Sequence, residues 1–224
     1  MDLKELAAKE AVDYVKDGMV VGLGSGTTAS IAIRLLGDKV RQGMRITGVP
    51  TSRDSEALGR SVGIPIGELK DYPEVDVTID GADEVDPDLN LIKGLGGALV
   101  REKIVASETK MEVITVDESK LVSHLCEKAP LPVEIVRFAA ESTMKRLERL
   151  GCVPKLREAK GLAFITDNGN LIADCRFRSI DDPRRMEADI NMMAGVVDNG
   201  LFVGLAHKVV VASKDGVRTI DRKS

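Results

Sequence analysis

Residues 19–36 read MVVGLGSGTTASIAIRLL, and this stretch decides the fold class. It joins a short apolar run, a glycine-rich loop and a segment whose apolar residues recur at helical spacing. The same alternation continues along the first half of the chain. It predicts strands over 19–23, 45–49, 75–79 and 111–116, with helices over 28–36, 52–61 and 98–106. Because the strands are apolar at nearly every position, we expect a parallel α/β sheet with helices on both faces.

The second half changes character after Pro130. A strand-like run at 132–136 is followed by a helix-period run at 139–151. Asn168-Gly169 then separates two apolar runs, and because both residues tolerate positive φ, this dipeptide predicts a hairpin. A final apolar run at 206–213 predicts a strand that returns to the main sheet.

These patterns predict two domains. We expect a Rossmann-like main domain formed by residues 1–129 and 200–224, and a smaller inserted α+β domain formed by residues 130–199. In an open parallel sheet, functional groups belong in the loops at the carboxyl ends of the strands. The loops after the predicted strands are therefore the places to search for chemistry.

The composition excludes several classes of protein. The chain has 224 residues, 43% of them hydrophobic, and a formal charge of -4, so it offers no basic field for nucleic acid. No apolar run approaches the roughly 18 residues that span a bilayer, and the N-terminus predicts an amphipathic helix rather than a signal peptide. Three widely spaced cysteines form neither a disulfide framework nor a metal motif, and we expect them to be buried. We expect a cytoplasmic protein.

The first candidate site is the loop from Gly22 to Thr28, which leads directly into a predicted helix. Glycines let backbone N–H groups approach a ligand and the helix N-terminus favours negative charge, so an anion is the natural ligand. A dinucleotide would require glycine at position 27, where this chain has Thr27, so phosphate is favoured. The hydroxyls of Ser25, Thr27 and Thr28 would supply further donors. The alternative is a tight turn with a hydroxyl N-cap.

The second candidate is the acidic segment Asp80–Glu84 after the third predicted strand. The carboxylates of Asp80 and Asp83 could bind sugar hydroxyls and move protons. The alternative is a solvated acidic turn. The segment lacks the spacing of a calcium-binding EF-hand loop, so we expect no metal.

The third candidate is a second glycine-rich loop, Lys93–Ala98, which enters a helix that contains Glu102. A lysine and several N–H groups could stabilise an oxyanion while the carboxylate acts as a base, which is what isomerisation through an enediolate requires. The alternative is that Glu102 lies on a solvated helix face.

Lys120, which follows the fourth predicted strand, either contacts substrate or is a surface lysine. The two histidines, which are isolated, are expected to be structural.

Several motifs together resemble the ribose-5-phosphate isomerase A family, in the family's order and over most of the chain. The motifs are GLGSGTTAS (22–30), TSRDSEALG (51–59), TIDGADEVDPDLNLIKGLGGALVREKIVA (78–106), VDESKLV (116–122), PLPVEI (130–135) and TDNGNLI (166–172). The resemblance implies an enzyme that interconverts ribose 5-phosphate and ribulose 5-phosphate through a cis-enediolate, in the non-oxidative pentose phosphate pathway. It implies no cofactor, no metal, and a homodimer or homotetramer.

The resemblance also implies roles for individual residues. Glu102 matches the proton acceptor, Asp80 and Asp83 match the acidic pair that handles ring opening and hydroxyl protons, and Lys93 matches the lysine beside the reacting oxygens. The implied substrate contacts are Lys4, Ser25, Gly26, Thr27, Thr28, Asp80, Gly81, Ala82, Asp83, Lys93, Gly94, Leu95, Gly96 and Lys120.

The chain departs from the family pattern in both glycine loops. The first loop reads Gly-Ser-Gly-Thr-Thr where the family commonly has Gly-Thr-Gly-Ser-Thr, which should preserve the hydroxyl donors. In the second loop, Leu95 stands where glycine is common, and leucine cannot adopt positive φ as cheaply as glycine can.

Two other functions fit the same motifs. One is a related enzyme of this broad fold, such as an amino-sugar-phosphate deaminase or a CoA transferase, which substrate profiling would distinguish. The other is a sugar-phosphate sensor without turnover. The absence of a helix-turn-helix segment and the presence of a complete acid–base set argue against the sensor.

Overall fold

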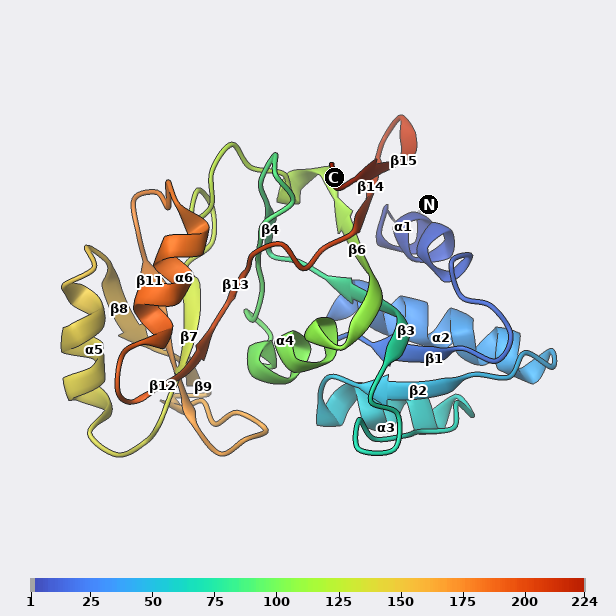
Figure 1. Ribbon diagram of the computed structural model, residues 1–224, viewed down its shortest axis with the longest axis horizontal. Helices are drawn as coiled ribbons and strands as arrows, with labels where there is room; N and C mark the ends of the chain where they lie inside the picture. Colours follow the sequence, from blue (N-terminus) through green and yellow to red (C-terminus); the bar gives the residue numbers. More distant parts are fainter. Residues whose placement is uncertain (1–2, 224) are drawn as a thin grey trace. The chain divides into compact units, whose positions relative to one another are not determined.

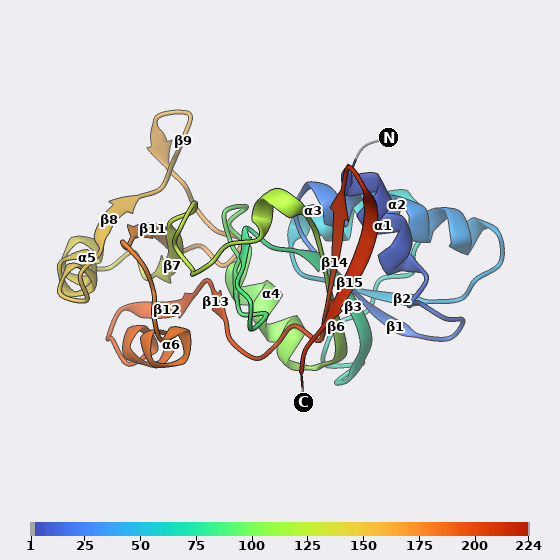
Figure 2. The same ribbon diagram turned by 90° about the horizontal axis from the view of Figure 1, so that it is seen from above.

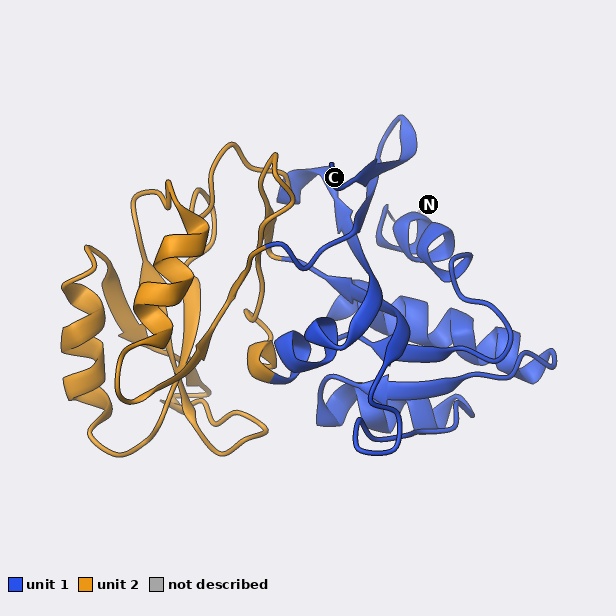
Figure 3. Cartoon of the chain, in the orientation of Figure 1, with its two compact units in different colours: residues 1–82, 101–120, 204–224 blue, residues 83–100, 121–203 orange. Residues whose placement is uncertain are grey.

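The structure is a computed structural model that describes residues 3–223. The chain divides into two compact units (Figure 3). Unit 1 is formed by the described parts of 1–82, 101–120 and 204–224, and unit 2 by 83–100 and 121–203. The predicted small domain, 130–199, falls within unit 2, which also includes 83–100 and the segments on either side of it. The domain boundaries themselves stay a prediction.

Unit 1 is built on a six-stranded sheet (Figure 1). The strands lie in the order β15 (Gly216–Asp221), β14 (Lys208–Ser213), β6 (Thr109–Asp117), β3 (Val75–Gly81), β1 (Val20–Leu23) and β2 (Thr47–Pro50). All neighbours are parallel except β14 and β15, which form an antiparallel pair and lie side by side in Figure 2 as well. The predicted final strand therefore does return to the main sheet.

Helices cover both faces of this sheet. The helices of unit 1 are α1 (Leu3–Val12), α2 (Thr27–Arg41), α3 (Arg53–Ser61) and α4 (Leu99–Ser107), whose residues from 101 onward belong to the unit. Buried residues of α1 and α2, among them Ala8 and Ile33, share one core cluster with strand residues such as Val21. On the other face, Val105 of α4 packs with Val49 and Val75. Burial on both faces explains the continuous apolar runs, and the predicted α/β fold class is confirmed.

Unit 2 contains mainly antiparallel sheet. Its four-stranded sheet has the order β12 (Val196–Asn199), β7 (Leu131–Ile135), β11 (Leu171–Arg176) and β8 (Val153–Leu156), accompanied by α5 (Ala140–Glu148) and α6 (Pro183–Asn191). A small sheet joins β13 (Leu201–Phe202), β5 (Leu91–Ile92) and β4 (Glu84–Val85), and β9 (Glu158–Ala159) pairs with β10 (Leu162–Ala163).

The predicted hairpin at Asn168-Gly169 is wrong in its strand pairing. A turn does form there, with Gly169 at φ 85° and its N–H donating to the Thr166 carbonyl. However, β10 before the turn pairs with β9, whereas β11 after it pairs with β7 and β8. The dipeptide therefore predicted the turn but not the pairing: β10 forms a hairpin with β9, two residues before it, and β11 pairs with the more distant β7 and β8.

Two expectations from composition are also answered. The three cysteines are buried free thiols, and burial raises the pKa of Cys126 to about 12. Among the described residues, no helix is both long enough and apolar enough to span a bilayer.

Candidate active site

The N-terminus of α2 is open to a ligand. Its N-cap is Gly26, at φ 89°, and no side chain caps the helix, so the alternative of a hydroxyl cap is wrong. A Cβ on Gly26 would meet nothing within 4 Å. Because the first N–H groups of a helix have no acceptor within the helix, this end presents donors and partial positive charge to an anion. Thr27 and Thr28 form the first positions of the helix.

Ser25 is held from two sides within unit 1. Its N–H donates to Asp80 Oδ1 at 3.0 Å, and its hydroxyl donates to Ser52 Oγ and lies 2.9 Å from Thr51 Oγ1. The Thr51 hydroxyl itself donates to the Leu23 carbonyl at 2.9 Å. Both donors of Ser25 are thus engaged inside the protein, which leaves the first turn of α2 to supply the donors for an anion.

Two lysines adjoin the same edge of the sheet. Lys4 Nζ on α1 donates to Thr27 Oγ1 at 3.0 Å, and Lys120 ends the short 3-10 helix Glu118–Lys120 that follows β6. Partial burial acts to raise the pKa of Asp117, but hydrogen bonds from Ser119 and the charges of Lys120 and Lys4 lower it overall. Because both lysine charges act on this one carboxylate, the two lysines among the predicted substrate contacts belong to one electrostatic cluster.

Asp80, at the carboxyl end of β3, is 1% exposed. Its Oδ1 accepts N–H bonds from Ser25 at 3.0 Å and from Gly81 at 2.7 Å, and its carbonyl accepts from the Thr115 hydroxyl. The alternative of a solvated acidic turn is therefore wrong for Asp80. Gly81 and Ala82, which follow it in unit 1, are partly exposed.

The second glycine loop lies in unit 2 and follows β5. Lys93 is 2% exposed, its N–H donates to the Gly200 carbonyl at 2.9 Å, and its Nζ lies 5.4 Å from the centroid of the Phe202 ring. Asp83 Oδ2 accepts the N–H of Leu95 at 2.9 Å. An acidic residue of the second motif is thus directly bonded to the third.

The presence of leucine in this loop causes no backbone strain. The positive φ angles fall on Gly94, at 102°, and Gly97, at 90°, while Leu95 is not among the non-glycine residues with positive φ. Its side chain is 41% exposed. The substitution therefore falls where the loop does not require glycine.

Glu102 lies on α4 and is only 5% exposed, and Lys103 is 9% exposed. The alternative of a solvated helix face is therefore wrong. Acidic side chains are rarely buried unless they are paired or functional. The burial of Glu102 therefore makes it the candidate functional carboxylate of α4.

The predicted residues are divided between the units. Unit 1 contains Lys4, Ser25, Gly26, Thr27, Thr28, Asp80, Gly81, Ala82, Glu102 and Lys120, and unit 2 contains Asp83, Lys93, Gly94, Leu95 and Gly96. Sequence reasoning missed Thr51, Asp117 and Arg157, whose contacts support these loops. Thr51 lies in the family motif 51–59 and Asp117 in the motif 116–122, so the resemblance could have indicated them. No motif near Arg157 indicated that residue.

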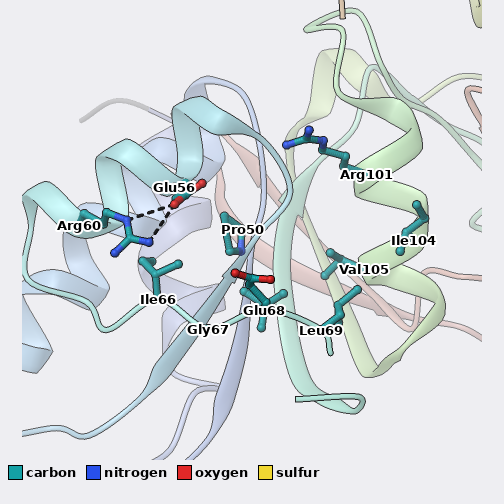
Figure 4. A pocket seen from close by; sticks show the side chains of 11 residues that line it. Pro50, Glu56, Arg60, Ile66, Gly67, Glu68, Leu69, Arg101, Ile104 and Val105 are labelled. Atoms are coloured by element: carbon teal, nitrogen blue, oxygen red, sulfur yellow. Dashed lines mark hydrogen bonds and ion pairs between the residues drawn. The ribbon is translucent and has the colours of Figure 1, made fainter. Parts of the chain in front are cut away.

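Unit 1 also contains a separate pocket of about 310 Å³ (Figure 4). Glu56 and Arg60, joined by hydrogen bonds of 2.9 and 3.1 Å, stand on one side, and Arg101 and Ile104 of α4 stand on the other. None of the predicted site residues lines it. Within residues 3–223, no group of three or more His, Cys, Asp or Glu side chains is arranged to hold a metal ion.

Comparisons with known proteins decide the family. A sequence model described as ribose 5-phosphate isomerase A (phosphoriboisomerase A) matches residues 47–216. The chain belongs to the ribose-5-phosphate isomerase A family. A family member from Gloeobacter violaceus is 49% identical over 219 residues, which cover 97% of this chain and 95% of that protein. One from Pyrococcus abyssi is 47% identical, with 99% and 98% of the two chains covered.

Solved structures of the family agree with the fold. A D-ribose-5-phosphate isomerase in complex with phospho-erythronic acid superposes with a TM-score of 0.97 at 43% identity, with 99% of this chain and 100% of that chain covered. The ribose 5-phosphate isomerase A from Methanocaldococcus jannaschii has a TM-score of 0.94 at 44% identity, with 98% of each chain covered. The similarity therefore extends over both units of the chain.

Proposed function

We propose that this chain interconverts ribose 5-phosphate and ribulose 5-phosphate, and that Glu102 is the base that transfers the proton. Family membership over nearly the whole chain supports the reaction. The observation that supports the role of Glu102 is its burial on α4, where a solvated helix face would have left it exposed. A carboxylate withdrawn from water is a stronger base toward a substrate that enters its surroundings.

The phosphate group would bind at the N-terminus of α2. The donors are the N–H groups of the first turn with the hydroxyls of Thr27 and Thr28, while Lys4 and Lys120 supply positive charge. Ser25 contributes by holding the loop to Asp80 and to the hydroxyl network of Thr51. Anchoring by a phosphate that does not react lets binding energy orient the sugar for the chemical step.

The reaction itself would proceed in three steps. Asp80 or Asp83 assists opening of the furanose ring by moving a hydroxyl proton. Glu102 then removes the proton from C2, and the electron pair of that bond forms the C1–C2 double bond of a cis-enediolate as negative charge develops on the C1 oxygen. Lys93 and N–H groups of the second glycine loop stabilise this oxyanion. Glu102 returns the proton to C1, while the proton of the O2 hydroxyl is transferred to the C1 oxygen with the help of Asp80 or Asp83. The C2–O2 bond becomes the carbonyl as the C1–C2 double bond becomes single, which gives the ketose with a hydroxyl at C1.

The test is to mix the protein with ribose 5-phosphate and EDTA and to follow formation of ribulose 5-phosphate for the native chain and for Glu102→Gln. A positioned base is worth about 10²–10⁴ in rate, so kcat should fall by about that factor. Competition by inorganic phosphate should be unchanged, because Glu102 is not among the proposed phosphate contacts. Glu108→Gln is the matched control, since Glu108 is the exposed glutamate just beyond the end of the same helix.

Two outcomes would reject this assignment. Normal turnover by Glu102→Gln would remove Glu102 as the base, and no turnover by the folded native chain would remove the reaction. Turnover in D₂O adds a check on the intermediate, because an enediolate pathway with a carboxylate base allows deuterium to enter the product at the transferred position. The homodimer or homotetramer and the cytoplasmic location stay predictions, which light scattering and cell fractionation would test.

A further inference from the structure

The second glycine-rich loop, Lys93–Ala98, accepts hydrogen bonds from a side chain far away in the sequence. Arg157 Nη1 donates to the carbonyls of both Gly94 and Leu95, at 2.8 Å each. The rest of the guanidinium is held by Asp174, through a 2.9 Å bond from Nε to Oδ2 and an ion pair from Nη2 to Oδ1. The arginine side chain is 12% exposed and the aspartate side chain 22%. Because Arg157 is fixed before it meets the loop, little entropy is lost in holding the two carbonyls.

An aromatic ring, that of Phe164, lies close to both Arg157 and the end of the loop. The Phe164 ring centroid lies 5.8 Å from Arg157 Cζ, and a Cβ on Gly97 would come within 2.4 Å of the same ring. The end of the loop is therefore in close contact with Phe164, and at position 97 only glycine provides both the space and the positive φ of 90°. Arg157, Phe164 and Asp174 all belong to unit 2, as does the loop.

The hydrogen bonds to the Gly94 and Leu95 carbonyls determine where the neighbouring N–H groups point. In a trans peptide unit the C=O and the N–H point in opposite directions. The unit that joins Gly94 to Leu95 has its carbonyl on Arg157 and its N–H on Asp83 Oδ2, at 2.9 Å. The next unit also has its carbonyl on Arg157, so the Gly96 N–H points away from the guanidinium.

The Gly96 N–H is an available donor. Within the part of the chain that the structure describes, it has no hydrogen-bond acceptor. A Cβ on Gly96 would meet nothing within 4 Å, so there is space beside it for a ligand atom. An amide of this kind, fixed in direction before the ligand arrives, is what stabilises a developing oxyanion.

We propose that Arg157, oriented by Asp174, is a positioning residue that draws the Gly94 and Leu95 carbonyls to one side and so aims the Gly96 N–H at the oxygen that gains negative charge in the reaction. The inference rests on the proposed function, in which this loop faces the reacting end of the sugar phosphate. Arg157 itself touches no substrate. Its contribution is to the transition state rather than to binding of the phosphate group.

The test compares Arg157→Gln and Arg157→Lys with native protein. Removal of one oxyanion donor costs about 10²–10³ in kcat, and a donor that is misdirected rather than absent should cost about 10- to 100-fold. We expect this loss in kcat with KM for ribose 5-phosphate nearly unchanged, and a partial recovery in Arg157→Lys, which can still bond one carbonyl. Arg176→Gln is the control, because that exposed arginine also donates to a carbonyl, that of Lys128, at 3.1 Å.

Two ligands separate a positioning role from a structural one. Inorganic phosphate should compete equally well in native protein and Arg157→Gln. Phospho-erythronic acid, whose carboxylate places negative charge at the reacting end, should bind about 10- to 100-fold more weakly to the variant, in step with the loss of kcat. Equal losses for both ligands would show general damage to the fold and would overturn the proposal, as would unchanged kcat and unchanged phospho-erythronate affinity.

A second variant covers failure of Arg157→Gln to fold. Asp174→Asn keeps the volume and leaves the arginine in place but removes the charge that orients it. It should show the same selective loss of kcat and of phospho-erythronate affinity at smaller size, and no loss would overturn the proposal. If native protein bound phospho-erythronic acid but did not turn over ribose 5-phosphate, the proposed reaction would fail, and the affinities alone would still decide the role of Arg157.

Discussion

A buried carboxylate next to the candidate site residue Asp83 gives the sharpest test of what stabilises unit 2. Glu84 is 0% exposed and accepts three backbone N–H bonds from one loop. Its Oε1 accepts from Lys128 at 2.5 Å and from Ala129 at 2.6 Å, and its Oε2 accepts from Cys126 at 2.6 Å. The loop contains little regular structure, so these three bonds define its conformation. We predict that Glu84→Gln destabilises unit 2 strongly.

The magnitude follows from the bonds. Glutamine keeps one acceptor oxygen for two of the N–H groups but turns an NH₂ toward the third. A buried donor left without an acceptor costs about 1–3 kcal/mol. The two remaining bonds lose the charge that made them about twice as strong as neutral ones, or about 0.5–1 kcal/mol each. Since bonds that share one group are not additive, we expect a total of about 2–4 kcal/mol.

Glu134→Gln is the matched control. Glu134 is also 0% exposed and also in unit 2, and its Oε1 accepts from Thr166, Asn168 and Asn170 side chains at 3.1, 3.1 and 2.8 Å. Its Oε2 makes no hydrogen bond to the described residues. Glutamine can keep all three bonds on its oxygen, although they lose their charge assistance. The same substitution removes a buried charge whose second oxygen, Oε2, has no hydrogen-bond partner among the described residues, and this gain offsets the loss. We therefore expect a net loss of less than about 1 kcal/mol.

The assay is urea unfolding followed by far-UV circular dichroism, because the chain has no tryptophan to serve as a fluorescent probe. Hydrogen exchange of peptides from 121–135 assigns the loss to unit 2. The reasoning is refuted if Glu84→Gln unfolds at the same urea concentration as native protein, or if Glu134→Gln costs as much as Glu84→Gln.

Two further predictions concern unit 1. The N–H of Val20 donates to Asp76 at 2.9 Å, and this bond and then the charge of Lys110 lower the pKa of Asp76. Its carboxylate therefore stabilises the fold above the unfolded pKa of about 3.8, and this stabilisation disappears as pH falls through the lower folded pKa. The difference in unfolding free energy between native protein and Asp76→Asn should be constant at neutral pH and shrink below about pH 4, and a difference that does not change with pH would refute this. Thr51→Val removes the hydroxyl that bonds Ser25 and Leu23. Loss of a hydrogen bond costs about 0.5–1.5 kcal/mol, so KM for ribose 5-phosphate should rise about two- to tenfold with little change in kcat. Thr51→Ser should behave like native protein, and equal effects of the two substitutions on KM would contradict the role of the hydroxyl.

Much of unit 1 could be predicted because its signals are local. The run Val20–Leu23 is apolar because both faces of the sheet are covered, and the glycines that follow mark a tight passage into α2. Burial of Glu102 could not be predicted in this way, because its neighbours Arg101 and Lys103 give the pattern of a solvated face. Which residues of a charged helix are buried depends on what packs against it, and sequence spacing does not report that.

Unit 2 shows the complementary limit. Asn168-Gly169 predicted a turn correctly, since positive φ is a property of the residues themselves. The strand before the turn, β10, pairs instead with β9, which ends only two residues before it, and the strand after the turn, β11, pairs with β7 and β8. The bonds from Arg157 to Gly94 and Leu95 cross 63 and 62 residues of sequence and end on backbone carbonyls, so no side-chain motif could have indicated them.

The supports of the two loops explain why binding and turnover should be separable by mutation. Ser25 is fixed by Thr51 and Asp80, all within unit 1, and the loop that they hold contains the proposed phosphate donors. The Gly94 and Leu95 carbonyls are held by Arg157, within unit 2, and in our proposal the Gly96 N–H that follows them stabilises the oxyanion. Since each support consists of contacts inside one unit, each loop can be disturbed without loss of the contacts that hold the other. Substitutions at Thr51 should therefore act on KM, and substitutions at Arg157 on kcat.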